Sequence, residues 1–322
     1  MDDLIPFSEL YWEQMQTLVH SREELEAEGY RMEGLTGEEI EGLKRCRDCG
    51  CRLRKSGKKK PKPKTDVEED LNILDDEDDK ENDKEKEKKE KEKKPQCRFH
   101  PGTVVAKRFT CCNAFHPHNP PGCVEHDGHT PRAYGPNELE DDWTFYPTPA
   151  TPSPDTRLAV ALDCEMGTSF AGDAELIRIS AVDYFSGRVL VDSLVYPAVA
   201  MAHFNTRYSG VTRGMLETAR RDNACLHGRD EARTAVWQFV GPHTVLVMHG
   251  GKADLLALRW IHGQAIDTYM VESGRDMGSQ KRSLRSLAEG MLGWRIQGGE
   301  HDSVEDARAC RGVVHWYVEN GL

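Results

Sequence analysis

Two carboxylates separated by one residue follow an apolar run in "ALDCEMG", residues 161–167. In a β-strand successive side chains point to opposite faces, so Asp163 and Glu165 share one face and Cys164 points to the other. Neighbouring carboxylates repel each other unless they are protonated or bridged by a cation, and their oxygen atoms suit Mg²⁺ or Mn²⁺. The pair therefore indicates a cation site, with Cys164 as a small core residue.

Further acidic residues and a histidine occur at positions that could face the same site. In "VLVMHGGKADLLAL", Asp254 stands just past an apolar strand and a glycine turn, near the start of a helix. In "GGEHDSVEDARAC", His301 precedes a helix and Asp306 lies in its first turns. Asp302 and Glu305 have the spacing of an N-cap and its capping partner. A loop histidine and a helical aspartate can then converge on one site.

The elements that must position these residues are expected between residues 158 and 322. Apolar runs predict strands at 158–166, 175–185, 188–196 and 244–248. Helical spacing, in most cases ending at glycine, predicts helices at 229–241, 252–263, 283–293 and 303–321. Strands followed by alternating helices and strands indicate an α/β domain with a mixed sheet flanked by helices.

A second group of candidate ligands consists of thiols and imidazoles. Seven of the ten cysteines lie between Cys46 and Cys123, in "CRDCGC", "CRFHPG", "FTCCNAF" and "GCVEHDGH". Alternating cysteine and histidine is the ligand set of closed structural zinc sites, and in a reducing compartment clustered cysteines favour metal binding over disulfides. A small zinc-stabilised module is therefore expected before the α/β domain.

Composition limits the remaining interpretations. The run 66–95 is dense in charge and almost without aromatic residues, which predicts a disordered insertion. Four prolines in "YPTPATPSPDTR" (146–157) favour a stiff linker. The formal net charge of -12 argues against nucleic-acid binding through bulk positive charge. No stretch has the apolar length or basic flank of a membrane span or signal peptide, so we expect a soluble intracellular protein without membrane contact.

Four blocks together resemble the DEDDh branch of the DEDD 3'-to-5' exonucleases, in particular the Rex-type RNA exonucleases. They are "ALDCEMG", "FNTRYSGVT", "HGGKADLLALRWIHGQAIDT" and "HDSVEDARA", in family order between 157 and 322. The resemblance implies an RNase H-like fold, two Mg²⁺ or Mn²⁺ ions, and His301 as general base. The implied ligands of these ions are Asp163, Glu165, Asp254 and Asp306. Two ions about 4 Å apart activate a water and stabilise both the attacking and leaving oxygens at phosphorus.

The same resemblance suggests substrate contacts. Met166 matches a residue that packs on the terminal base, and Arg207, Tyr208 and Ser209 lie in the "NTRYSGVT" block, where Tyr208 and Ser209 could shape either the site or only the loop. Further phosphate contacts are expected, with solvated surface as the equal alternative, at Arg213, Arg220 and Arg221. Ala253 departs from the Asn common in relatives, and His249 is expected to be structural.

The cysteine-rich region resembles a CHORD module, a cysteine- and histidine-rich domain that holds two zinc ions. The resemblance implies ligands at Cys46, Cys51, Cys97, His100, Cys111, Cys112, Cys123 and His129, with Cys49 and His126 as competing choices. The charged insertion makes the Cys51–Cys97 spacing longer than in that family, and His100–Cys111 is shorter. One or two structural Zn²⁺ ions therefore remain open.

The expected organisation is a helical segment at 1–45, the zinc module at 46–135, a linker at 136–157 and an exonuclease domain at 158–322. The expected function is hydrolysis of RNA 3' ends to 5'-mononucleotides, in RNA processing or ribosome biogenesis. Single-stranded DNA is the alternative substrate, and a non-catalytic scaffold that binds RNA or protein is the alternative class. The basic run "KKKPKPK" (58–64) favours a nuclear location, with the cytoplasm as a second one.

Overall fold

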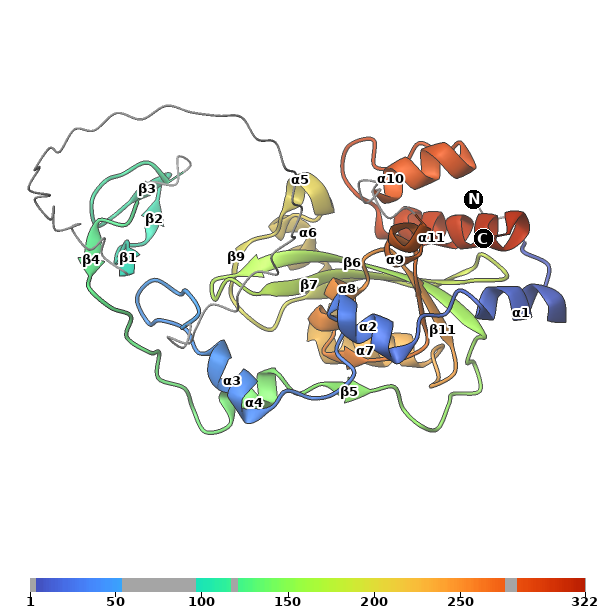
Figure 1. The fold of residues 1–322 in the computed structure, drawn as a ribbon. Coiled ribbons are helices and arrows are strands. Elements are labelled where there is room, and N and C mark those ends of the chain that lie inside the picture. Colours follow the sequence, from blue (N-terminus) through green and yellow to red (C-terminus); the bar gives the residue numbers. More distant parts are fainter. Residues whose placement is uncertain (1–3, 54–96, 117–120, 276–282, 322) are drawn as a thin grey trace, which may run out of the picture. The chain divides into compact units, whose positions relative to one another are not determined.

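The computed structural model describes residues 4–53, 97–116, 121–275 and 283–321 (Figure 1). The chain forms two compact units, one joining Met1–Glu41 to Tyr134–Leu322 and the other spanning Gly42–Ala133. The basic run 58–64 and the charged insertion 66–95 lie outside the described residues. Among the described helices, none combines the length and apolar character that crossing a membrane requires.

A seven-stranded mixed sheet forms the centre of the larger unit. Its strand order is β10-β8-β7-β6-β11-β13, and β9 pairs with β6. β6 pairs antiparallel with β7 and parallel with β11. The strands are β6 (Ala159–Ser169), β7 (Ala174–Asp183), β8 (Val189–Tyr196), β9 (Met201–His203), β10 (Leu226–His227), β11 (Val245–Met248) and β13 (Ala265–Asp267). The predicted mixed sheet with flanking helices is confirmed.

Strand alternation along β6 separates two apolar cores. Ala159 and Ala161 face α11 (Ser303–Asn320), which lies over one side of the sheet (Figure 1). Cys164 instead joins the cluster on the opposite side, which contains residues of α7 (Gly228–Trp237) and α8 (Lys252–Ala257). The cysteine is a buried core residue, as predicted, and this leaves its two acidic neighbours on the α11 side.

Two predicted helices differ from the observed elements. The helix expected to reach residue 263 ends at Ala257, because Arg259 adopts a left-handed conformation with φ of 50°. The chain then extends into β12 (Trp260–Ile261). The helix expected at 283–293 is α10 (Leu284–Leu287) followed by the π-helical turn Ala288–Leu292. The other helices of this region are α5 (Thr206–Ser209), α6 (Arg213–Arg221) and α9 (Thr268–Arg275).

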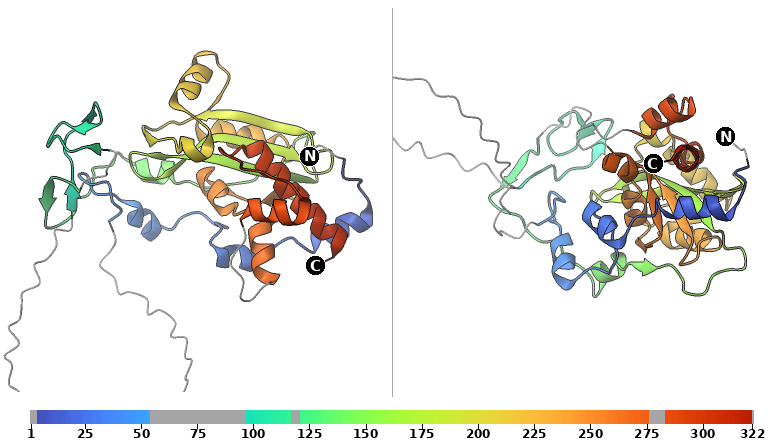
Figure 2. Two further views of the ribbon diagram at one scale, coloured as in Figure 1. Left: turned by 90° about the horizontal axis from the view of Figure 1, so that it is seen from above. Right: turned by 45° about the vertical axis from the view of Figure 1, so that its right-hand side comes forward.

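The N-terminal segment belongs to the larger unit rather than standing apart. It contains α1 (Glu9–Gln16), α2 (Arg22–Glu28) and the start of α3 (Gly37–Leu43). Tyr11 and Met15 are buried in the same core as α11, and α1 lies beside α11 in both views of Figure 2. The Tyr11 hydroxyl lies 2.8 Å from that of Tyr184. Burial of these apolar side chains holds the segment on the sheet.

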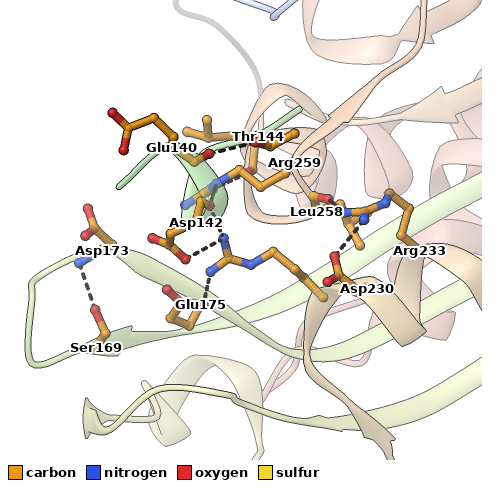
Figure 3. Close-up of polar contacts among 12 residues, drawn as sticks. Glu140, Asp142, Thr144, Ser169, Asp173, Glu175, Asp230, Arg233, Leu258 and Arg259 are labelled. Carbon is orange, nitrogen blue, oxygen red and sulfur yellow. Dashed lines mark hydrogen bonds and ion pairs between the residues drawn. The ribbon is translucent and has the colours of Figure 1, made fainter. Parts of the chain in front are cut away.

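The segment 138–147, part of the predicted linker, also packs on the larger unit. It contains α4 (Glu138–Asp142) and β5 (Tyr146–Pro147), and β5 pairs with β12. Trp143 is buried, with the Arg259 guanidinium 3.6 Å from its ring centre. Arg259 also donates to the Asp142 carbonyl, close to the acidic side chains shown in Figure 3. The segment 138–147 is therefore anchored at several points and forms a docked strap rather than a free spacer.

The smaller unit consists of short strands. β1 (Cys97–Phe99) pairs antiparallel with β4 (Val124–His126), and β2 (Val104–Val105) pairs with β3 (Arg108–Phe109). Isolated two-stranded ribbons are marginally stable in water. Further cross-links are therefore required to hold this unit together.

The docked strap leads to a stability prediction. Replacing Trp143 by Ala should lower the free energy of unfolding by about 3 kcal/mol, because a large aromatic side chain and its contact with Arg259 are lost. Urea denaturation followed by circular dichroism measures the change. Leu158→Ala, at a side chain 50% exposed, serves as the control and should change stability little. Equal stability of Trp143→Ala and the parent protein would mean that the strap is only a spacer.

Candidate functional site

The predicted acidic residues meet in one buried cluster, to which β6 presents its two carboxylates on the α11 side. Asp163 and Glu165 come from β6, and Asp306 comes from the first turns of α11. Ligand atoms of Glu165, Asp306 and His301 all lie within 4.8 Å of one another. Asp254 lies in the first turn of α8, and the Cys164 backbone hydrogen-bonds to it. The sheet, one helix start and one loop therefore converge on a single cluster.

Burial and mutual repulsion make this cluster electrostatically unfavourable without a cation. Burial, reinforced by the charges of Asp254, Asp306 and Glu165, raises the pKa of Asp163 well above its usual value. Burial and the charge of Asp306 raise the pKa of Glu165 to about 8. The pKa of Asp254 is also raised by burial, and that of Asp306 is raised to about 6. Bound divalent cations would stabilise the ionised forms.

The two oxygens of the Asp306 carboxylate have different surroundings. Gln297 Nε2 donates to Oδ2 at 2.8 Å, whereas Oδ1 is buried and has no hydrogen-bond partner among the residues that the structure describes. Buried polar atoms without a partner are rare in folded proteins and often indicate an absent ion or water. The donor set, which consists of carboxylate oxygens, fits hard divalent metal ions such as Mg²⁺ or Mn²⁺.

A glycine turn presents Asp254 to the cluster. Gly250 has φ of 69°, and a Cβ on Gly251 would lie only 2.4 Å from Met248 Sδ. The turn therefore requires glycine at both positions. The Gly250 N–H donates to Asp267 Oδ1 at 2.7 Å. His249, next to the turn, contacts Thr268 Oγ1 at 2.9 Å, in agreement with a structural role.

His301 sits on the loop that enters α11. Its backbone N–H donates to the Tyr208 carbonyl, and its Nδ1 lies 3.5 Å from Asp306 Oδ2. Asp302 is the N-cap of α11, as predicted, and accepts from the N–H groups of Val304 and Glu305. Glu305 does not complete the expected capping box, because its carboxylate accepts from the Gln297 N–H instead.

Arg178 links the sheet to the start of α11. It lies directly opposite Glu165 across the β6–β7 pair and donates to both carboxylate oxygens of Asp192. Arg178 also reaches Asp302 Oδ1 at 3.5 Å. Its positive charge partly offsets the upward shift in the pKa of Glu165. Arg178, His301 and Asp302 line a cavity of about 580 Å³, an opening large enough for part of a polymer end.

The residues expected to contact substrate have different environments. Met166 is half-buried and its carbonyl accepts from Asn205 Nδ2, while Tyr208 is 60% exposed with its ring edge toward His301. Arg207 lies over the Tyr208 ring at 5.9 Å. Ser209 is buried, and its hydroxyl bonds to the Phe204 carbonyl and the Val211 N–H, which gives it a role in shaping the loop.

The three arginines of α6 are exposed. Arg220 lies 3.4 Å from Glu217, and Arg221 contacts Thr218 at 3.0 Å. Arg213 lines a small cavity with Tyr196 and Glu217, and His301 lines a different one. Ala253 is exposed, so at this departure from the family pattern the side chain faces water.

The smaller unit gathers its thiols and imidazoles into two groups. Ligand atoms lie within 4.8 Å of one another in Cys46, Cys49, Cys97 and His129, and again in His100, Cys111, Cys112 and Cys123. The second group agrees with the expected ligands.

In the first group Cys49 takes the place expected for Cys51. The Sγ atom of Cys51 lies outside this group but 3.2 Å from that of Cys49. His126 belongs to neither group and lies 3.7 Å from Asp48.

Two residues of the acidic site escaped prediction from the sequence. Gln297 lies in the loop before His301, and Arg178 lies within an apolar strand pattern. The alternation of side chains along β7 could have indicated which face of the sheet Arg178 occupies. Placing it opposite Glu165 also requires the register of β7 against β6, which the sequence does not give. Gln297 has no local signal, because its partner lies on another element.

The chain is similar in sequence to known exonucleases. A family model described as "Exonuclease" matches residues 160–313. RNA exonuclease 3 of Candida albicans is 31% identical over 235 residues, covering 70% of this chain and 55% of the relative. RNA exonuclease 1 of Saccharomyces cerevisiae is 35% identical over 162 residues, covering 50% of this chain and 28% of the relative.

The solved Pan2 catalytic unit of Neurospora crassa matches with 24% identity and a TM-score of 0.45, over 52% of this chain and 28% of that one. The chain spans about half the length of the Candida relative and less of the yeast one.

The bond from Gln297 to Asp306 leads to a prediction about metal binding. Gln297→Met should weaken Mn²⁺ binding by about tenfold, because Asp306, expected to be a metal ligand, loses the donor that orients its carboxylate. Gln297 also lowers the pKa of Asp306, so its loss raises that pKa further. Protons should therefore displace the metal at a higher pH than in the parent protein. Titration calorimetry between pH 5.5 and 8 measures both effects. Gln14→Met, at an exposed residue, is the control, and identical binding curves for all three proteins would contradict the prediction.

Proposed function

Because residues 160–313 match a family model described as exonuclease, we propose that this protein is a metal-dependent 3'-to-5' exonuclease that releases 5'-mononucleotides from RNA. The observation that carries the proposal is the cluster of Asp163, Glu165, Asp254 and Asp306 beside His301. Relatives named RNA exonuclease support RNA as the substrate. An entirely structural role would not explain why the carboxyl groups have raised pKa values, or why Asp306 Oδ1 is buried without a hydrogen-bond partner among the described residues.

The residues of the cluster divide the chemistry among them. Two Mg²⁺ or Mn²⁺ ions, when bound, would activate a water and neutralise charge on the attacking and leaving oxygens. Asp163, Glu165, Asp254 and Asp306 would hold these ions. His301 is partly exposed at the cavity and can accept the proton of the attacking water. The Tyr208 carbonyl and the Asp302 cap keep the His301 loop in place.

Met166, Arg207 and Tyr208 would contact the terminal nucleotide and its phosphate. Exposed rings can stack on any base, so these contacts favour single-stranded ends without strong sequence preference. Single-stranded DNA is the second candidate substrate, because a site of phosphate contacts and metal ions does not depend on the 2'-hydroxyl. We further propose RNA or ribosomal RNA maturation in the nucleus as the setting, and RNA or a protein as the partner of the smaller unit.

Cleavage of labelled oligonucleotides tests the proposal. RNA labelled at the 5' end should shorten one nucleotide at a time with Mg²⁺ or Mn²⁺ and remain intact with EDTA. Asp163→Asn should reduce the rate by at least about 1,000-fold, because Asp163 would supply one of the four carboxylate charges that hold the metal ions. Matched DNA strands measure the substrate preference. RNA that binds but stays intact with every metal would instead support the scaffold alternative.

We propose that the smaller unit holds two structural Zn²⁺ ions, one in each of its cysteine and histidine groups. The Sγ atoms of Cys46 and Cys97 lie 3.7 Å apart. Tetrahedral zinc with bonds of about 2.3 Å requires sulfur atoms separated by about 3.8 Å. Backbone contacts beside the first group join the two ends of the unit. Cys46 forms an antiparallel β-bridge with Pro131, and the Arg47 N–H donates to the Thr130 carbonyl.

Matched cysteine variants test the zinc assignment. Metal analysis of the purified protein should find two zinc ions per chain. Cys49→Ser should lose one of them and unfold part of the unit, because a three-ligand site binds zinc more weakly. Cys51→Ser should keep both ions. The opposite result would make Cys51 the ligand, and zinc-free native protein would refute the proposal.

A further inference from the structure

Residues 20–30 pack against the two elements that carry Asp254 and Asp267. The His20 N–H donates to the Ala265 carbonyl of β13 at 3.0 Å. Lys252, in the first turn of α8, donates from Nζ to Glu28 Oε1 at 2.8 Å and to the Glu28 carbonyl at 3.0 Å. Since α8 also carries Asp254, a segment more than 220 residues away in the chain contacts the helix turn that presents a proposed metal ligand.

Tyr30 makes the most buried of these contacts. It is 4% exposed, and its hydroxyl donates to Asp267 Oδ2 at 2.5 Å. Asp267 is fully buried at the end of β13, and its other oxygen accepts from the N–H groups of Gly250 and Tyr269 at 2.7 and 3.0 Å. One carboxylate therefore joins the N-terminal segment to the glycine turn before Asp254.

In these hydrogen bonds Tyr30 and Gly250 donate and the Asp267 carboxylate accepts. Burial and the neighbouring charges of Asp267 and Asp254 raise the pKa of Tyr30, so its hydroxyl remains a donor. A buried carboxylate with donors on both oxygens has one orientation. If Oδ2 lost its donor, Asp267 would rotate or draw in water, and its bond to the Gly250 N–H would weaken. The turn would then no longer hold Asp254 in one place.

We propose that Tyr30 is a positioning residue for Asp254, and that residues 20–30 complete the metal site of the exonuclease unit. The inference rests on the proposed function, because it concerns the same cluster. Tyr30 touches neither substrate nor metal and acts only through Asp267 and the turn at Gly250. The N-terminal segment is thereby part of the active site's support.

Metal binding and amide exchange of the full chain test this inference. Tyr30→Phe removes only the hydroxyl and should weaken Mn²⁺ binding by about tenfold in titration calorimetry. Amide hydrogens of residues 249–255 should exchange faster with deuterium in this variant. Tyr11→Phe is the matched control, because it removes another buried tyrosine hydroxyl of the same segment, one that contacts Tyr184 and His315. It should leave Mn²⁺ affinity within twofold of the parent protein at comparable thermal stability.

Each outcome separates the two proposals. If Asp163→Asn abolishes Mn²⁺ binding but Tyr30→Phe binds like the parent protein, this inference is overturned and the proposed function stands. Equal weakening by Tyr30→Phe and Tyr11→Phe also overturns it, since the effect would then be general destabilisation. A parent protein that binds no Mn²⁺ would contradict the proposed function itself. If Tyr30→Phe fails to fold, Lys252→Met removes the link to Glu28 instead and should weaken Mn²⁺ binding two- to fivefold, and unchanged binding would overturn the inference.

Discussion

The repulsion among four carboxylates gathered in one buried cluster is the constraint on which the larger unit depends. Burial raises the pKa of each and makes their joint ionisation costly without cations. A polypeptide that gathers such groups must oppose the repulsion with structure formed elsewhere. In this protein a hydrogen bond from Gln297 orients the Asp306 carboxylate, and the positive charge of Arg178, opposite Glu165, reduces the repulsion.

That structure has both apolar and polar parts. Two cores on either side of β6 fix the strand so that its acidic residues face α11 and Cys164 faces away. The N-terminal segment and the strap at 138–147 then cover edges of the same unit, through Tyr11 on one side and Trp143 on another. Chain segments that look dispensable in sequence thus contribute to the rigidity that a preorganised site requires.

The smaller unit differs from the larger one in its strands and in its candidate metal ligands. Its strands are too short to bury a large core, and thiols and imidazoles converge in two groups instead. Soft sulfur ligands favour zinc, whereas the carboxylates of the larger unit favour Mg²⁺ or Mn²⁺. The difference in ligand chemistry would direct the proposed ions to different sites within one chain. With the proposed zinc ions bound, folding of the smaller unit would also be sensitive to chelators, unlike the apolar core of the sheet.

The sequence by itself determined whatever depends on local periodicity and capping. Alternation put Asp163 and Glu165 on one face with Cys164 in the core, and Asp302, directly after His301, was recognisable as a helix cap. Tertiary structure alone decided which partners those residues take. Glu305 turned to Gln297 rather than closing a capping box, Cys49 rather than Cys51 joined the first thiol group, and Trp260 left its predicted helix to pair with the strap. The pairing of Trp260 with Tyr146, and of Cys49 with Cys97 and His129, joins residues far apart in the chain, which only the folded arrangement brings within reach. The contact between Glu305 and Gln297 spans eight residues and depends on how the loop before α11 folds against the helix.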